Sequence, residues 1–348
     1  MSSRKIEVLA RAKRAGLFDL ARRRTASGIR ILCYHGLWLG DDTFRGDSMF
    51  MMQKTFVRRL ALLRREGYPT IALGDAIAAL QGRGPMLPPA AVVITIDDGW
   101  ASTYLGMLPA LERHGMPATL FCDSEQLMRR GPVAHVMVRY FDRIASTMPH
   151  ASRQGSVDVA AAASRAIATD SARSYDERYA ATEKLAAALG LDMAVYLSRR
   201  AFDYMTPEEL RDAAGRGLNV QLHAHRHTLG DMSRAVIEDE ISTNRQVLGD
   251  LLGHAPIDFK HFCYPSGVAT PAAAGILASL GIESATTTQQ GIARPGTAMH
   301  LLPRLLDGEN LSEIEFEAEV SGFGSWLRRG RHLVRPFIGR DTRQQRGL

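Results

Sequence analysis

The spacing of hydrophobic positions changes repeatedly along this chain, from short continuous runs to helical spacing and back. Seven short apolar runs with β-forming residues predict strands, at residues 29–33, 91–96, 118–122, 219–222, 259–263, 283–287 and 301–305. Stretches with helical spacing separate most of them, at residues 56–65, 75–80, 105–114, 233–252 and 271–280. Asp75 is the expected N-cap of its helix. Strands that alternate with helices predict a parallel sheet, so the fold class is α/β and the expected architecture is a barrel.

Three segments depart from this alternation. Residues 125–215 are rich in Ala and Arg and have few β-branched runs, which predicts a helical insertion. Residues 39–50 are rich in Gly and Asp and predict a loop. Residues 3–24 predict one basic amphipathic helix, with Ile6, Leu9, Leu17 and Leu20 near one face.

The expected domain organisation has three parts. A basic N-terminal helix covers residues 1–27, a barrel with its insertion covers 28–306, and a basic tail covers 307–348. The chain of 348 residues is 45% hydrophobic and 23% charged, which is ordinary globular composition and excludes a disordered chain. No apolar stretch approaches the roughly 18 residues of a spanning helix, and the first thirty residues lack a signal-peptide core.

Charge is distributed unevenly along the chain. Residues 1–30 carry a net +7 and residues 325–348 a net +6, so the part between them carries −7. An acidic body disfavours nucleic acid as a partner, whereas basic ends attract an anionic membrane surface. Residues 323–329 with Phe337 and Ile338 resemble an interfacial anchor. The alternative is that both ends are solvated, Arg-rich tails.

The cysteine pattern indicates no disulfide framework. Cys33, Cys122 and Cys263 are odd in number and widely spaced, which argues against paired cysteines and against a cysteine-built zinc site. A reducing cytoplasm fits this pattern. The expected localisation is therefore cytoplasmic, with the basic ends resting on the inner face of the membrane.

Two adjacent carboxylates follow one predicted strand. Asp97 and Asp98 come directly after an apolar run, where a buried negative charge is costly unless a cation compensates it. A metal ion would do so, with one carboxylate as ligand and its neighbour free to act as a base. The alternative is an Asx-turn with both carboxylates in solvent.

Histidines cluster after another predicted strand. His223, His225 and His227 lie within five residues, and His223 and His227 converge on one ion if the segment turns helically, with His225 pointing elsewhere. A polar loop with incidental histidines is the alternative. Together with the carboxylates, a His₂Asp set with open positions is typical of a catalytic metal site.

Two further strand ends carry candidate chemistry. His35 follows the first strand and is a candidate proton donor, although a lone histidine is more often structural. Tyr264 lies in a Pro/Gly turn whose backbone N–H groups could help to hold an oxyanion, and a plain strand-ending turn is equally consistent.

These motifs, taken in order, resemble the polysaccharide deacetylases, also called the NodB-homology or carbohydrate esterase 4 family. The segment from Thr95 to Gly99 is similar to the family's T-F-D-D-G motif, and the segment from His223 to His227 is similar to its H-[ST]-x-x-H motif. The resemblance covers about residues 28–306 except the insertion at 125–215. It is closest to the circularly permuted branch that acts on poly-β-1,6-N-acetylglucosamine, where the acid histidine has the position of His35.

The resemblance implies a distorted (β/α)7-type barrel and a role for each site residue. Asp97 would be the general base, His35 the general acid, and the backbone N–H of Tyr264 an oxyanion donor. The divalent metal ligands would be Asp98, His223 and His227. Zinc is the expected ion, with cobalt or nickel as alternatives. Asp97 and His35 are expected on opposite sides of the scissile bond.

The sequence departs from the family pattern at three positions. Ile96 replaces a Phe, Ala224 replaces the Ser or Thr that would orient the histidine loop, and Cys263 stands where many members have an Arg beside the base. Arg304 is a candidate substitute for that positive charge.

The implied function is hydrolysis of N-acetyl groups on a sugar polymer or lipid-linked glycan, in cell-envelope or exopolysaccharide biosynthesis. Alternatives are a deformylase or an O-acyl esterase on a related sugar, which would use the same residues. A catalytically silent glycan-binding barrel is a third alternative, but a binding protein has no need for all five site side chains.

Overall fold

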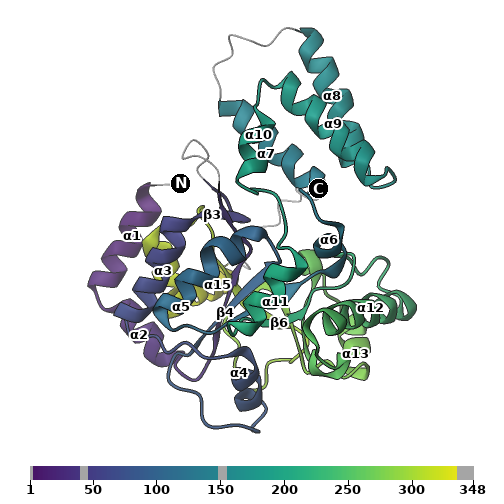
Figure 1. Ribbon diagram of the computed structural model, residues 1–348. Helices are drawn as coiled ribbons and strands as arrows, with labels where there is room; N and C mark the ends of the chain where they lie inside the picture. Colours follow the sequence, from purple (N-terminus) through teal and green to yellow (C-terminus); the bar gives the residue numbers. More distant parts are fainter. Residues whose placement is uncertain (1–2, 40–45, 148–154, 335–348) are drawn as a thin grey trace.

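The computed structural model describes residues 3–39, 46–147 and 155–334 (Figure 1). Seven parallel strands close into a barrel, with β9 paired to β1 through Leu32 and Leu305. The barrel strands are β1 (Arg30–Tyr34), β4 (Val92–Asp98), β5 (Ala118–Cys122), β6 (Asn219–Leu222), β7 (His261–Cys263), β8 (Ser284–Gln290) and β9 (Leu302–Leu306). The predicted (β/α)7-type barrel is confirmed.

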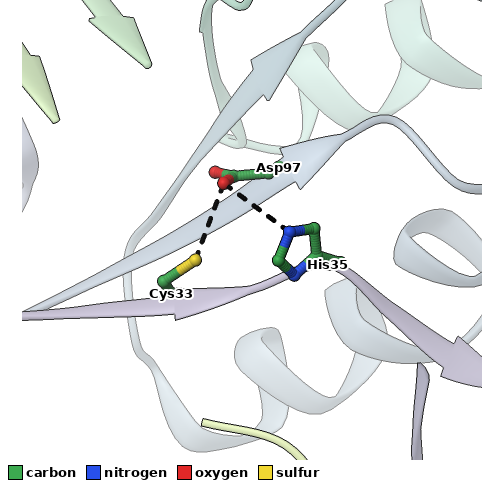
Figure 2. Close-up of side chains that lie close together, drawn as sticks. All are labelled: Cys33, His35 and Asp97. Carbon is green, nitrogen blue, oxygen red and sulfur yellow. Dashed lines mark hydrogen bonds and ion pairs between the residues drawn. The ribbon is translucent and has the colours of Figure 1, made fainter. Parts of the chain in front are cut away.

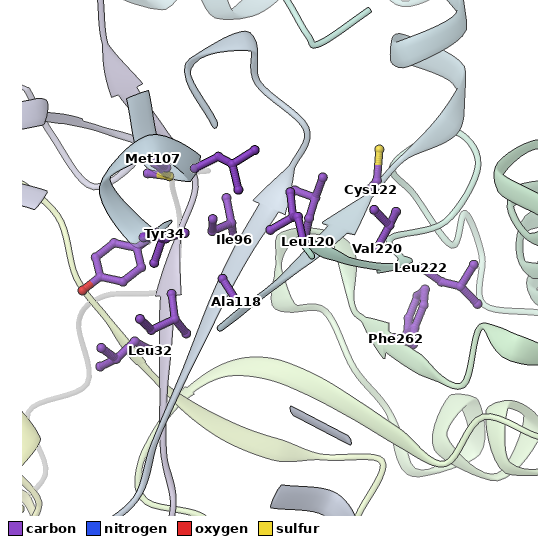
Figure 3. Packing of buried hydrophobic residues seen from close by; sticks show 14 of the residues in the cluster. Leu32, Tyr34, Ile96, Met107, Ala118, Leu120, Cys122, Val220, Leu222 and Phe262 are labelled. Carbon is purple, nitrogen blue, oxygen red and sulfur yellow. The ribbon is translucent and has the colours of Figure 1, made fainter. Parts of the chain in front are cut away.

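Alternate residues of the strands enter two different cores. Ile94 and Ile96 of β4 belong to the large apolar cluster between the barrel and its surrounding helices, which Figure 3 shows in part. Val93, which lies between them and points to the other face of the strand, belongs to a smaller cluster that strand residues share with the helix Leu73–Leu80. Every residue of β1 and β4 is buried. Parallel strands covered on both faces read as continuous apolar runs, which is why the sequence predicts these strands well.

Helices surround the barrel between successive strands. They are α3 (Gln53–Arg65), α4 (Leu73–Leu80), α5 (Leu108–His114), α11 (Pro207–Gly215), α12 (Arg234–Leu252) and α13 (Pro271–Ser279). A π-helical turn at Thr103–Met107 precedes α5. Asp75 is not the N-cap of α4, because that helix begins two residues earlier and its N-cap is Ala72.

Short strands flank the predicted loop at residues 39–50, of which 40–45 lie outside the described residues. Residues Gly36–Trp38 form β2 and Phe50–Met52 form β3, and the two pair in parallel as a separate two-stranded sheet. These three-residue strands give little periodic signal in the sequence.

The predicted insertion at residues 125–215 is helical, as expected. Its last helix is α11, which is one of the helices around the barrel. The insertion also contains α6 (Ser124–Arg129), α7 (Ala134–Thr147), α8 (Gly155–Thr169), α9 (Tyr175–Ala188) and α10 (Met193–Ser198). Helices α7–α10 project from one side of the barrel in Figure 1. A buried aromatic cluster fastens the insertion, with Trp38, Phe50 and Trp100 from the barrel side against Tyr140 and Phe202.

The N-terminal segment forms two helices, α1 (Ser3–Arg14) and α2 (Leu17–Arg24), instead of the single one expected. Gly16 adopts a left-handed conformation (φ 73°) between them and breaks the helix. The expected apolar face is divided, because Leu9 is buried whereas Ile6, Leu17 and Leu20 are each at least 37% exposed.

Part of the expected C-terminal tail is also helical. Glu313–Ser321 forms α14 and Phe323–Val334 forms α15. Phe323 packs on Phe18 of α2 with ring centroids 5.2 Å apart, so the two ends of the described chain share one apolar cluster. Phe337 and Ile338 lie outside the described residues. Among the described helices, none is both long and apolar enough to span a membrane. The division into three domains stays a prediction.

Candidate metal and catalytic site

The predicted site residues gather at the carboxyl ends of three strands. His35 follows β1, Asp97 and Asp98 are the last two residues of β4, and His223 follows β6. Parallel strands carry their carboxyl ends to the same rim of a barrel, so residues distant in sequence meet there. This placement was expected, except that the two carboxylates belong to the strand itself instead of a following turn.

Asp98, His223 and His227 form a compact cluster. Nε2 of His223 lies 3.4 Å from Oδ1 of Asp98, and Nε2 of His227 lies 3.3 Å from the same oxygen. Two ligands of a tetrahedral ion with bonds of about 2.0–2.2 Å are separated by roughly 3.3–3.5 Å. The three side chains therefore fit a divalent ion with two nitrogen ligands and one oxygen ligand.

The protonation of His223 also suits a metal ligand. Its Nδ1 lies 2.8 Å from the carbonyl oxygen of Cys263, which can only accept a hydrogen bond. Nδ1 of the ring therefore carries a hydrogen, and in the neutral ring the lone pair is on Nε2, the atom that faces Asp98. His223 is buried and His227 is partly exposed, so the cluster opens on the side of His227.

The two histidines converge by a route that the sequence did not predict. The segment is not helical: Ala224 (φ 66°) and His227 (φ 56°) adopt left-handed conformations within a loop. His225 points away, as expected, and its Nδ1 lies 2.9 Å from the hydroxyl of Ser124.

Asp98 is held on both of its oxygens. The indole N–H of Trp100 donates to Oδ2 at 2.7 Å, which leaves Oδ1 toward the histidines. Burial alone would raise the pKa of Asp98, but without an ion, hydrogen bonds donated by Nε2 of His223 and of His227 hold it well below its usual range. A bound ion would take the place of those two hydrogens. Sequence reasoning missed Trp100, although its place one residue after Gly99 keeps it beside the carboxylate pair.

Asp97 has entirely different neighbours. Its two oxygens accept hydrogen bonds of 2.7 Å from both terminal nitrogens of Arg304, a fully buried residue of β9. Burial would raise the pKa of Asp97, but the charge and hydrogen bonds of Arg304 lower it to about 2. The expected substitution of Arg304 for the missing motif arginine is thus present as a direct ion pair.

Two thiols complete the surroundings of Asp97. The sulfur atoms of Cys33 and Cys263 lie 3.6 and 3.5 Å from Oδ2, and Figure 2 shows the first of these contacts. Asp97 also lies close enough to cysteine and histidine atoms to form two other candidate ligand groups among the described residues. Because Arg304 already occupies both oxygens with a fixed cation, the Asp98 cluster suits a metal better.

His35 lies beside Asp97, directly after the neighbouring strand β1. Its Nε2 is 4.0 Å from Oδ2 of Asp97 (Figure 2), because β1 and β4 pair with Tyr34 opposite Ile96. The two groups therefore face each other nearly in contact, and the expected placement on opposite sides of an acyl group is not seen. The His35 side chain is 24% exposed, so a substrate can reach it.

The expected oxyanion donor is already in use. The backbone N–H of Tyr264 donates to the carbonyl of Thr286 at 3.1 Å and thus belongs to the pairing of β7 with β8. The Tyr264 ring is buried against Phe262. The structure contradicts the oxyanion role for this N–H, because a strand-to-strand hydrogen bond would have to break first.

The comparison with protein families agrees with this site. Residues 166–285 match the family model named Polysaccharide deacetylase, and the matched segment contains both His223 and His227. Over these residues the chain is similar to that family. The match begins within α8, so it includes part of the insertion that the sequence resemblance left out.

A curated relative extends the similarity over most of the chain. The poly-beta-1,6-N-acetyl-D-glucosamine N-deacetylase of Escherichia coli (strain K12) is 26% identical over 289 residues, which is 81% of this chain. The aligned part is 38% of that relative's length, so the chain spans well under half of it.

Solved structures share the fold. The Streptococcus pyogenes deacetylase PplD, in complex with acetate, superposes with a TM-score of 0.56 at 16% identity, covering 86% of this chain and 98% of its own. IcaB from Ammonifex degensii gives 0.55 at 18% identity, covering 85% and 98%. At these identities the likeness establishes the barrel fold, and the chemistry rests on this chain's own side chains.

Proposed function

We propose that this chain is a metal-dependent hydrolase that removes N-acetyl groups from an N-acetylated sugar polymer or a lipid-linked glycan. The observation that carries the proposal is the Asp98, His223 and His227 cluster, with Asp97 and His35 directly beside it. The match of residues 166–285 to the polysaccharide deacetylase family model and the similarity to an N-acetyl-D-glucosamine polymer deacetylase support it. A role in exopolysaccharide or cell-envelope biosynthesis belongs to the same proposal.

The metal ligands would be Asp98, His223 and His227. An ion held by them would supply a Lewis acid that polarises an acyl carbonyl and lowers the pKa of water from about 15.7 towards 7. The nitrogen-rich ligand set fits zinc, and cobalt or nickel would also fit.

Asp97 and His35 would divide the proton transfers. Asp97 is ionised throughout the neutral range because Arg304 lowers its pKa to about 2, so it can accept a proton from the attacking water. His35 would then donate a proton to the departing amine. Since the two groups are 4.0 Å apart, one proton could pass between them during turnover.

Position at a membrane is a separate proposal. We propose that the basic N-terminal helices rest on the anionic inner face of the membrane, where lipid-linked glycans would be accessible. Ile6, Leu17 and Leu20 stay exposed among nine Lys and Arg residues of segment 1–30, a combination that suits an interfacial helix. We expect the chain to float with phosphatidylglycerol vesicles and not with phosphatidylcholine vesicles, and Leu17→Glu with Leu20→Glu to abolish flotation. Failure of the wild-type chain to float with either vesicle type would reject this proposal.

Acetate release tests the activity itself. The chelated protein is given zinc or cobalt and incubated with N-acetylglucosamine oligomers, with Asp97→Asn and the exposed-site control Glu238→Gln beside it. We expect acetate only after metal is restored, lost in the first variant and unchanged in the second.

The other outcomes discriminate the alternatives. Bound metal without acetate release, but with release from formylated or O-acetylated sugars, would replace the N-acetyl assignment by a deformylase or an esterase. Absence of both metal binding and acyl release would overturn the hydrolase and favour a silent glycan-binding barrel.

A further inference from the structure

The loop that carries the histidines has a conformation that its own residues do not favour. Ala224 and His227 both have positive φ, and a non-glycine residue in this region costs on the order of 1 kcal/mol or more. Such a conformation persists only where the surroundings impose it. Ala224 has no side-chain donor or acceptor with which to fasten the loop, so the restraint must come from elsewhere.

Helix α12 presents two buried polar side chains to this loop. Glu240 and Asn244 are four residues apart, which places them on the same face of the helix. Their exposed fractions are 1% and 0%. Buried polar groups on a helix face destabilise the fold unless hydrogen bonds compensate them, so a helix that served only for packing would carry apolar residues there.

Both side chains accept hydrogen bonds from the backbone of the loop. Oδ1 of Asn244 accepts from the N–H of His223 at 3.1 Å, and Oε2 of Glu240 accepts from the N–H of Arg226 at 2.8 Å. The other oxygen of Glu240 accepts from Nε of the Arg226 side chain at 2.5 Å. One helix face therefore fixes the loop at its first ligand and at the residue before its second ligand.

Further hydrogen bonds link Asn244 to the end of β5 and the loop to the first residues of α6. The amide of Asn244 donates to the carbonyl of Cys122 at 3.2 Å and to the hydroxyl of Ser124 at 3.0 Å. That hydroxyl contacts Nδ1 of His225, and the backbone N–H of Glu125 donates to the carbonyl of His225 at 2.9 Å. The restraints thus fall on positions 223, 225 and 226, and the two left-handed residues lie between or beside them.

We infer that Glu240 and Asn244 are positioning residues for the metal ligands, which hold the loop in its ligand-converging shape before an ion binds. The inference rests on the metal site proposed above, and neither side chain is itself a ligand. Preorganised ligands bind an ion without first ordering the loop, so loss of the restraint lowers affinity for the metal without removing a ligand.

The test measures zinc affinity by competition with a chromophoric chelator on the full chain. Glu240→Ala is expected to weaken zinc binding by about 10–100-fold, the range for residues that orient metal ligands. Glu240→Gln is expected to lie between it and the wild type, because an amide oxygen can still accept from the Arg226 N–H. Glu238→Ala, on the same helix but in an exposed pair with Arg234, is the matched control and is expected to bind zinc as the wild type does.

A second measurement separates positioning from general destabilisation. At saturating zinc, acetate release by Glu240→Ala is expected to return to within a few-fold of the wild type, because the ligands and the base are intact. Unchanged zinc affinity in Glu240→Ala and Glu240→Gln would overturn the inference while leaving the metal site in place. Absence of zinc binding in the wild type would instead reject the metal site. If Glu240→Ala does not fold, the isosteric Glu240→Gln decides the question.

Discussion

Asp97 and Asp98 are neighbours in the chain, yet they occupy two unlike environments. Asp97 follows the side of β4 that faces the barrel interior, where it meets the fixed cation of Arg304 and two thiols. Asp98 turns the other way, at φ 78°, toward the imidazoles of His223 and His227 and the indole of Trp100. One carboxylate is neutralised by a permanent charge, and the other is surrounded by groups that can share an ion with it. The difference supports the proposed roles of Asp97 as general base and Asp98 as metal ligand.

The largest effect is expected from a substitution of Asp98, the carboxylate of the proposed ligand cluster. Asp98→Ala removes the only oxygen of the ligand cluster, so both zinc binding and acetate release should fall to background. Isothermal titration with zinc measures the first and the acetate assay the second. Retained zinc binding of wild-type strength would show that the ion binds elsewhere.

A substitution of Asp97, the proposed base, should lower activity without weakening metal binding. Asp97→Asn keeps the shape of the side chain but cannot accept the proton, so kcat should fall by about 10²–10⁴-fold. Zinc affinity should stay within a few-fold of the wild type. A parallel loss of zinc would indicate that Asp97 also ligates the ion and would erase the contrast between the two carboxylates.

Removing the cation tests why Asp97 stays ionised. The pKa of Asp97 is lowered to about 2, so its pair with Arg304 stabilises the fold above the ordinary carboxyl pKa and this stabilisation is lost as the pH falls towards 2. Arg304→Met leaves a buried carboxylate without its partner, which should cost about 3–5 kcal/mol in the free energy of unfolding. The acid limb of kcat/KM should also move to higher pH, since burial then raises the pKa unopposed.

A conservative variant at the same position distinguishes charge from packing. Arg304→Lys keeps the positive charge but loses the paired hydrogen bonds, so it should restore part of the acid-side activity. Urea unfolding and a pH–rate profile give the two readouts. An acid limb that does not move in Arg304→Met would mean that another group controls it.

The smallest effect is expected at Trp100. Trp100→Phe keeps an aromatic ring in the cluster but removes the N–H that holds Oδ2 of Asp98, so zinc affinity should fall by about tenfold. Trp38→Phe, in the same aromatic cluster, controls for the loss of ring volume. Equal zinc affinities in the two variants would show that the indole hydrogen bond does not orient the ligand.

The sequence predicted the barrel well because strands such as β1, β4 and β5 are buried on both faces. The position of Asp97 and Asp98 at the end of β4 followed from that pattern. The convergence of His223 and His227 was also predicted, but by a helical turn, whereas left-handed backbone brings them together. Loop conformations of this kind depend on tertiary hydrogen bonds from α12, which have no periodic signature.

The errors at the edges of the site have similar causes. The Tyr264 N–H was expected to be an oxyanion donor, but it donates to the carbonyl of Thr286 in the pairing of β7 with β8. The acid and the base were placed on opposite sides of the substrate, but neighbouring strands put them in near contact. Strand order in a closed barrel is a global property, so residues on adjacent strands cannot be recognised from their local sequence.

The pair formed by Arg304 and Asp97 also has a kinetic consequence. The two residues are separated by 207 positions, and Arg304 lies on the strand that closes the barrel against β1. Contacts between residues so distant in sequence form late, because loop closure must precede them. During refolding Asp97 is therefore expected to gain its counter-charge only when the last strand docks, so its native proton affinity should appear after most helical structure. A chain that stalls before that step would hold an unpaired carboxylate in its interior, which destabilises the partly folded state.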